Sequence, residues 1–361
     1  MCEVVFRPTA QLRRHAAIDY HGENMKLLPA LCFTAALLAQ TWAPQTSNTR
    51  ASLRGVSAVD ARSVWASGSG GAWLATTDGG VTWRAAKVPG AETLDFRGIR
   101  AIDARTVYLM SAGSGDQSRV YKTSDAGRHW TLLFTNPDPQ GFFDAIAFWD
   151  AQHGIVIGDP IDGRAEVLTT DDGGATWQRR NPPAALPNEG SFAASNTCLT
   201  LLGKQDAFFA TGGPSAARIF HSRDRGLSWT VAGTPIRHDS PSAGIFSLAF
   251  ADPSHGIAVG GDYSKDTDDR QNIALTSDGG RSWSSPPGPG PKGFRSAVSY
   301  VPGRKLWIVT GTSGSDLSGD GGKTWKLFDS GAYNAMSFVP GGAGWAVGPQ
   351  GRIARFEAPA H

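Results

Sequence analysis

The sequence predicts an all-β fold, a seven-bladed β-propeller, and three observations carry this prediction. An octet of the form S/T-x-D-x-G-x-x-W occurs six times along the 361 residues. The tryptophans that end these octets are 42 to 54 residues apart, close to the length of a four-stranded propeller blade. Helical periodicity is missing after about residue 44, and 22 prolines also disfavour helices.

Each octet is interpreted as a turn between two strands. Its Asp can accept hydrogen bonds from backbone N–H groups just ahead, and its Gly permits a positive φ. Its Trp begins the next strand and buries a large ring. We therefore expect structural roles for the Asp and Trp of all six copies: Asp78 and Trp83, Asp125 and Trp130, Asp172 and Trp177, Asp224 and Trp229, Asp278 and Trp283, Asp320 and Trp325.

The octet resembles the Asp-box, or BNR repeat, of β-propellers such as sialidases and sortilin-like receptors. The runs 256–260 and 344–348 are similar to the H-G-x-x-V-G pattern of the Ycf48/HCF136-like photosystem II assembly factors. This second resemblance extends over nearly all of the chain after residue 43. It implies seven blades, no cofactor, and an arginine-lined surface used in assembling protein complexes.

The first 43 residues are expected to lie outside the propeller. Residues 25–43 have the basic start, short apolar run and small-residue end of a signal peptide, and residues 1–24 are interpreted as a non-native extension. Residues 44–361 then form a single domain that is secreted or periplasmic. The last unit lacks one strand, and residues 45–51 are expected to supply it and close the ring. Without the first 43 residues, Cys198 is the only cysteine, so no intrachain disulfide can form.

The innermost strands are expected to place one residue each around the mouth of the central channel. By alignment of the repeats these residues are Arg54, Arg97, Asp144, Asn196, Phe246, Arg295 and Asn334. Three guanidiniums in one mouth can hold a carboxylate, a phosphate or an acidic peptide. The alternative is that each Arg pairs with a local carboxylate or faces channel water. Aromatic residues near the same strands, and Tyr263 in a long loop, are further candidates for contacting a ligand.

The long loop at residues 262–272 is acidic and invites comparison with calcium sites. It lacks the EF-hand spacing and the terminal Glu of that motif, so we interpret it as a solvated loop and predict no metal. The formal net charge is +2, which gives no electrostatic case for nucleic acid or an anionic membrane.

These features predict an exported, monomeric binding propeller without a cofactor. Its partner is a protein or peptide client, or a carbohydrate, and no stable membrane insertion is expected once the signal peptide is removed. The alternative is a glycoside hydrolase with its site in the same mouth, using carboxylates from Asp144, Asp159, Glu189 and Asp262. The R-I-P signature that accompanies the arginines of sialidases is absent, and no residues support a redox activity.

Overall fold

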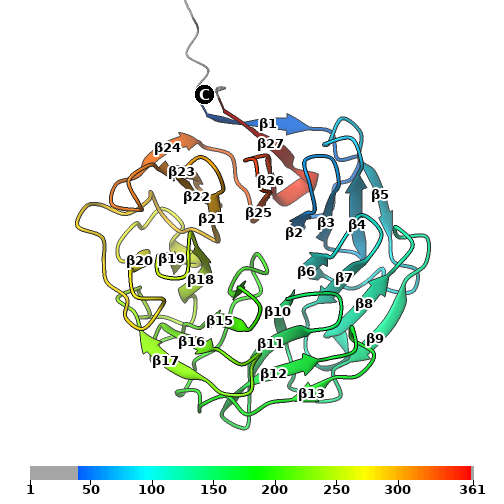
Figure 1. Cartoon of the computed structure of the whole chain (residues 1–361), viewed down its shortest axis with the longest axis horizontal. Helices are drawn as coiled ribbons and strands as arrows, with labels where there is room; N and C mark the ends of the chain where they lie inside the picture. The colour runs from blue at the N-terminus through cyan, green and yellow to red at the C-terminus, as the bar shows by residue number, and fades with distance from the viewer. Residues whose placement is uncertain (1–39, 359–361) are drawn as a thin grey trace, which may run out of the picture. The chain divides into compact units, whose positions relative to one another are not determined.

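A computed structural model of the chain describes residues 40–358, and these form seven antiparallel sheets arranged around a central axis (Figure 1). Each sheet is one blade, so the predicted seven-bladed β-propeller is confirmed. The expectations for residues 1–24 and for most of the predicted signal peptide fall outside the described residues. In the described part of the chain, no helix is long and apolar enough to cross a membrane.

Five blades consist of four strands that follow one another in the chain, with the first strand innermost. These are blade 1, β2(Leu53–Ala58) β3(Val64–Gly68) β4(Ala72–Thr76) β5(Arg84–Lys87); blade 2, β6(Phe96–Ala101) β7(Val107–Ser111) β8(Arg119–Thr123) β9(Thr131–Thr135); blade 3, β10(Phe143–Phe148) β11(Gly154–Ile161) β12(Arg164–Thr170) β13(Gln178–Arg179); blade 4, β14(Leu199–Leu202) β15(Asp206–Ala210) β16(Arg218–Ser222) β17(Thr230–Gly233); and blade 6, β21(Ala297–Val301) β22(Leu306–Gly311) β23(Gly314–Ser318) β24(Lys326–Asp329). Three short 3-10 helices lie in loops: η1(Gly115–Gln117), η2(Tyr263–Lys265) and η3(Pro349–Gly351).

Blade 5 has three strands, β18(Ala243–Phe250), β19(Gly256–Asp262) and β20(Ile273–Thr276). Only one bridge, between Leu275 and Ser284, continues the sheet outward. Pro286 and Pro287 follow soon after Ser284, and neither has a backbone N–H to donate to a neighbouring strand. The prolines therefore explain why the outer strand of this blade stops after one pair.

Blade 7 closes the ring with strands from both ends of the described chain. It contains β25(Ala335–Phe338), β26(Gly344–Val347), β27(Ile353–Glu357) and, outermost, β1(Thr41–Gln45). The closing strand thus begins before the expected segment 45–51, and it includes the last residues of the predicted signal peptide. Trp42 is only 2% exposed, and its indole N–H donates to Ser315 Oγ at 3.1 Å. Cleavage after Ala43 would remove this anchor, so the expected boundary conflicts with the paired strand.

The hydrophobic core lies between neighbouring blades rather than at one centre. The cluster between blades 1 and 2, for example, joins Trp65 and Trp73 to Phe96, Leu109 and Tyr121. Trp65, Trp73 and Leu109 come from strands buried on both faces, since each sheet packs against a blade on either side. The packing fixes the angle between blades and so determines how the inner strands meet at the axis.

The six octets form closely similar turns between the third strand and the segment that follows it. In the first, Asp78 accepts hydrogen bonds from the N–H of Thr82 at 2.9 Å and from its hydroxyl at 2.6 Å, while Thr76 Oγ1 accepts from the N–H of Gly80. These hydrogen bonds lower the pKa of Asp78 to about 2. In blade 1 the octet begins at Thr76, which pairs with Val64 at the far end of the sheet from Leu53. The turns therefore lie at the opposite end from the start of the inner strand.

Candidate functional site

Four of the inner strands carry a β-bulge, at the start of the strand in β2, β6 and β10 and after three residues in β18. In blade 1, Leu53 pairs with Gly68 and Gly55 pairs with Ser67, so Arg54 between them has no partner. A bulged residue leaves the ladder and its side chain is turned away from the regular alternation of the strand. The corresponding register shifts in β6, β10 and β18 leave out Arg97, Asp144 and Phe246.

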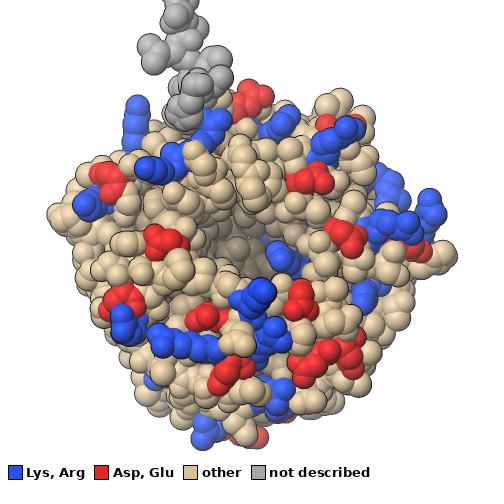
Figure 2. Space-filling view, viewed as in Figure 1, with Lys and Arg blue, Asp and Glu red and all other residues tan. Residues whose placement is uncertain are grey.

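The four bulged residues line a cavity of about 500 Å³ at this end of the channel. Asn334 and Tyr263 also line it, so six of the eight residues predicted near the mouth meet here, the exceptions being Asn196 and Arg295. In Figure 2, the visible face of the propeller has a hollow at its centre, and a basic side chain lies at the edge of this hollow.

Arg54 and Arg97 lie close enough for each charge to affect the other. Burial lowers the pKa of Arg54, and the neighbouring Arg97 lowers it further, opposed by Asp95. Arg97 forms an ion pair with Asp95 at 2.8 Å, whereas Arg54 makes no ion pair within residues 40–358. The Nε of Arg54 is buried and lacks a hydrogen-bond partner. This end of the channel therefore holds a guanidinium with unmet donor capacity and no neutralising carboxylate of its own.

Both arginines donate to one backbone carbonyl, that of Ala193. The distances are 3.2 Å from Arg97 Nη1 and 3.5 Å from Arg54 Nη2. Ala193 belongs to residues 190–197, here called the crossing segment, which joins blades 3 and 4. Ala193 and Ala194 line the cavity between the arginines and the rest of the wall. The cavity is thus built partly by a loop.

The crossing segment is held at both ends. At one end, Gly190 forms a β-bridge with Gly212. A Cβ on Gly212 would lie 2.6 Å from the ring of Phe192, so a side chain at this position would collide with that ring. Further along, Ser195 Oγ donates to the carbonyl of Ser296 in blade 6 at 2.8 Å. Asn196, predicted to lie at the mouth, instead bonds to blade backbones deeper in the channel and lines a second cavity of about 240 Å³.

One wall of the cavity is aromatic. Phe192 stacks on Phe246 with ring centroids 3.9 Å apart, and Phe294 meets Phe246 edge-on at 4.7 Å. Tyr263 packs its edge on the same ring at 6.0 Å and is 55% exposed. The arginines come from blades 1 and 2, whereas this wall comes from the crossing segment, blade 5 and the connection from blade 5 to blade 6, so the cavity has a cationic side and an aromatic side.

Asp144 lines the cavity as a buried carboxyl group. Its residue is 1% exposed, and neither side-chain oxygen has a hydrogen-bond partner of ordinary geometry. Burial raises its pKa well above the usual range, and Asp159 raises it further. Arg97 lowers this pKa, and the nearby N–H of Ala193 lowers it by a smaller amount without forming a proper hydrogen bond. The neutral acid is therefore favoured more strongly here than in water.

Arg295 lies away from the arginine pair. Its side chain is fully buried, and its Nε and Nη2 donate to Asp316 Oδ2 at 2.9 and 2.5 Å. The repeat alignment was one residue out of register, and a shift of one residue turns a strand side chain to the other face. A Cβ built on Gly311 would lie 3.2 Å from the Cα of Arg295, and one built on Gly68 would lie 3.1 Å from the Cα of Leu53. Arg295 in blade 6 is therefore equivalent to Leu53 in blade 1, and not to Arg54. Ser296 therefore occupies the position expected for Arg295, and it lines the cavity.

Of the remaining carboxylates of the glycosidase alternative, Asp159 and Glu189 line one and the same cavity, whereas Asp262 does not line it. Asp159 lines a neighbouring cavity of about 750 Å³, and burial raises its pKa to about 6, opposed by the N–H of Ser191. Glu189 is buried against Arg218, whose Nε donates to it at 2.8 Å. Burial raises the pKa of Glu189, but the hydrogen bonds from Arg218, the N–H of Leu186 and Thr211 outweigh it, so the pKa is lowered. Asp262 is held in a network of its own.

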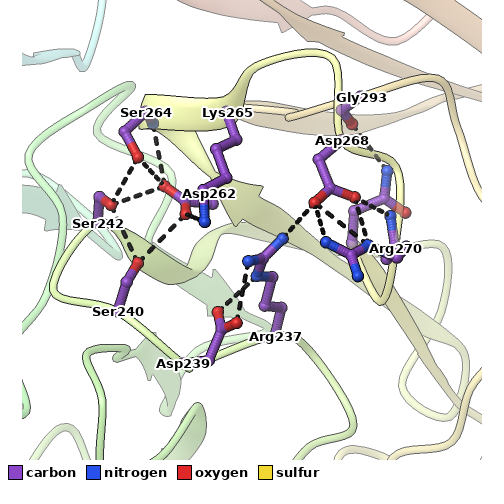
Figure 3. A network of polar contacts seen from close by, with 11 residues as sticks. Arg237, Asp239, Ser240, Ser242, Asp262, Ser264, Lys265, Asp268, Arg270 and Gly293 are labelled. Atoms are coloured by element: carbon purple, nitrogen blue, oxygen red, sulfur yellow. Dashed lines mark hydrogen bonds and ion pairs between the residues drawn. The ribbon is translucent and has the colours of Figure 1, made fainter.

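The long acidic loop that follows β19 is tied down by two polar clusters (Figure 3). In one, three serine hydroxyls donate to Asp262 and, against the effect of burial, lower its pKa to about 2, with Lys265 Nζ 3.7 Å away. In the other, Arg237 pairs with Asp239 on one side and Asp268 on the other. Within the described residues, no group of three or more His, Cys, Asp or Glu is placed to hold a metal ion.

Fold and site together define a seven-bladed β-propeller with a two-sided cavity at one end of its channel. No family model matches the chain. The photosystem II assembly lipoprotein Ycf48 of Synechococcus sp. (strain CC9902) is 27% identical over 121 residues. This match covers 33% of the present chain and 32% of that protein, so it spans about a third of each.

Solved structures of the same fold cover most of the chain. Ycf48 bound to D1 peptide aligns with a TM-score of 0.62 and 16% identity, over 88% of this chain and 97% of that one. Ycf48 from Cyanidioschyzon merolae aligns with a TM-score of 0.59 and 15% identity, over 88% and 98%. The WD40 β-propeller domain of Doa1 has a TM-score of 0.56 and 14% identity, over 89% and 98%. The resemblance to the Ycf48-like propellers that the sequence predicted is confirmed.

Proposed function

We propose that this protein is a non-catalytic binding propeller that holds a segment of a client protein in the cavity beside Arg54 and Arg97, as an assembly scaffold. The observation that carries the proposal is the unneutralised, half-buried Arg54 next to a second guanidinium. Buried cations are normally paired, so an unmet guanidinium facing a cavity favours an anionic group from outside. Ycf48 is an assembly lipoprotein, and it has been solved with D1 peptide bound, which supports a peptide as the ligand class.

The cationic and aromatic sides of the cavity indicate which chemical groups a bound client segment would carry. An extended segment with a carboxylate beside an apolar or aromatic side chain would place the carboxylate on Arg54 and Arg97 and the side chain on the wall formed by Phe192 and Phe246. We further propose that the protein works outside the cytoplasm, in the periplasm or beyond, on the strength of the signal-like residues 25–43. The glycosidase alternative has less support, because Asp144 lines a different cavity from Asp159 and Glu189, and Glu189 is already paired with Arg218.

A peptide array tests the proposal with purified protein. Peptides should vary an acidic residue next to Phe or Tyr, and binding is expected only where both are present. Replacement of Arg54 and Arg97 by Gln should weaken binding by more than about tenfold, since each charge-assisted hydrogen bond contributes roughly 1.5–3 kcal/mol. The matched control replaces Arg105 and Arg128 by Gln, because both are exposed at the opposite end of blade 2. Equal binding by both double variants would reject the arginine pair as the site.

The same variants can be used with envelope extracts. Client capture should depend on Arg54 and Arg97 and should be competed by the best peptide from the array. Capture that persists in the double variant would place the client on another surface of the propeller.

A further inference from the structure

The cavity contains a second group whose hydrogen-bonding capacity is unmet, and it is an acid. Both oxygens of Asp144 are buried without a partner, while the side chain lines the same cavity as Arg54, whose Nε is also unpartnered. Buried polar groups in folded proteins are nearly always satisfied, and those that are not commonly belong to a binding site. A ligand that fills the cavity would need to satisfy a guanidinium and a carboxyl group together.

The groups around Asp144 determine which form of the acid is present. Asp159 from β11 faces it with a like charge, and Arg97 from β6 faces it with an opposite one. Cys198 is also close, but burial raises the pKa of its thiol well above the usual range, so it contributes no charge. Arg97 is already paired with Asp95, and Asp144 makes no ion pair within residues 40–358. A charged Asp144 would be desolvated and only weakly compensated, whereas a neutral one carries a proton that it can donate.

We propose that Asp144 contacts the ligand as a neutral carboxylic acid and donates a hydrogen bond to a ligand carboxylate that Arg54 and Arg97 also bind. This rests on the proposed function and adds to it the ligand class and a pH dependence. An ionised Asp144 would repel the ligand carboxylate and leave it one donor short. Affinity for carboxylates should therefore fall as the pH rises and Asp144 loses its proton.

Three small probes separate the alternatives. They are 3-phenylpropionate, 3-phenylpropanamide and 3-phenylpropylammonium, which share an aromatic ring for the wall at Phe246 and differ only in the polar head. Binding is measured by ligand-observed NMR titration from about pH 5 to about pH 9, with millimolar affinity expected for ligands of this size. The protein used is residues 40–361, because this span retains β1.

Two substitutions at Asp144 then distinguish its roles. Asp144→Asn keeps a neutral donor, so it should bind the carboxylate as the wild type does at low pH and lose the pH dependence. Asp144→Ala removes the donor and should weaken carboxylate binding at low pH roughly tenfold, the usual effect of one hydrogen bond to a charged group. Asp159→Asn is the control, because Asp159 titrates nearby but lines the other cavity. It should leave a clear pH dependence in place.

The expected result is that the carboxylate binds more tightly than the amide, that its affinity drops at least about tenfold toward high pH, and that Asp144→Asn abolishes the drop. Carboxylate binding that requires Arg54 and Arg97 but is independent of pH would overturn this role of Asp144 and leave the proposed function standing. Preference for the ammonium probe, increasing with pH, would show that Asp144 acts as an anion and would also overturn it. No binding of any probe at any pH would reject the cavity as a carboxylate site, and the proposed function with it.

Discussion

Arg295 and Asp316 form an ion pair that is closed off from solvent, with both side chains almost fully buried and Nη2 2.5 Å from Oδ2. Replacement of Arg295 by Met would leave the Asp316 carboxylate buried without its partner. We expect a loss of about 3–5 kcal/mol in the free energy of unfolding, measured by chemical denaturation. The double variant Arg295→Met with Asp316→Leu removes both charges and should recover most of this loss. A double variant no more stable than the single one would contradict this account.

The closing strand depends on Trp42, whose ring meets Phe356 edge-on at 5.4 Å and lies close to Phe328 and Phe338. Trp42→Ala should cost about 3–5 kcal/mol, as is usual when a large buried ring is removed. Guanidinium denaturation provides the measurement. Leu327→Ala is the control, because Leu327 lies on the neighbouring β24 and is exposed, so its loss should change stability little. Similar stability of the two variants would indicate that β1 does not close the ring in solution.

Asp144 should make the stability of the unliganded protein depend on pH. Its pKa is raised in the folded state, so its contribution is fully present below the ordinary pKa of Asp and is lost as the pH rises through the folded value. Each unit by which the folded pKa exceeds the ordinary one corresponds to about 1.4 kcal/mol. Asp144→Asn cannot ionise, so the melting temperature of this variant relative to wild type should increase from acid to alkaline pH. A constant difference across that range would show that Asp144 is already ionised at low pH.

Asp159 should add a smaller effect of the same sign. Its folded pKa is about 6, so its contribution is lost between the ordinary pKa of Asp and about pH 6. Melting curves of Asp159→Asn measure this component separately from that of Asp144.

The acidic loop after β19 should depend on Arg237 for its order. This guanidinium joins Asp239 to Asp268, and its side chain is 7% exposed. Arg237→Ala should increase hydrogen exchange of the loop amides with little change elsewhere. Lys292→Ala breaks an exposed ion pair with Asp269 and serves as the control, since such pairs contribute little. Equal exchange in both variants would mean that backbone contacts alone hold the loop.

A screen with fluorogenic sialosides and β-glucosides tests the glycosidase alternative. We expect no turnover by the purified protein, because Glu189 and Asp262 are held in polar networks and the other two carboxyl groups line separate cavities. Turnover that disappears in Asp144→Asn or Asp159→Asn would instead favour catalysis in the mouth.

The repeat in the sequence was sufficient for the fold, because each octet marks the same turn and the spacing between octets sets the size of a blade. It also placed Arg54 and Arg97 together, since the inner strands of neighbouring blades begin at the same level. The repeat alignment placed Arg295 wrongly, because the connection before this strand differs in length from the others and no motif next to the strand sets its register.

The crossing segment could not be predicted for a different reason. Residues 190–197 have no regular periodicity, and their path depends on contacts with several blades, such as the hydrogen bond from Ser195 to Ser296. Contacts of this kind depend on the assembled ring and leave no mark on the local sequence. The same holds for the burial of Asp144, whose environment is built partly by Ala193.

The pairing of Thr41 with Glu357 at one end of blade 7, and of Gln45 with Ile353 at the other, has a practical consequence for experiments. Asn334 and the cavity lie at the Gln45 end, so the chain enters β1 and leaves β27 at the far end of the blade. A tag fused directly before Thr41 or directly after Glu357 would therefore be attached at the end of the blade away from the ligand cavity. A tag inserted in the Asp262 loop would instead obstruct it.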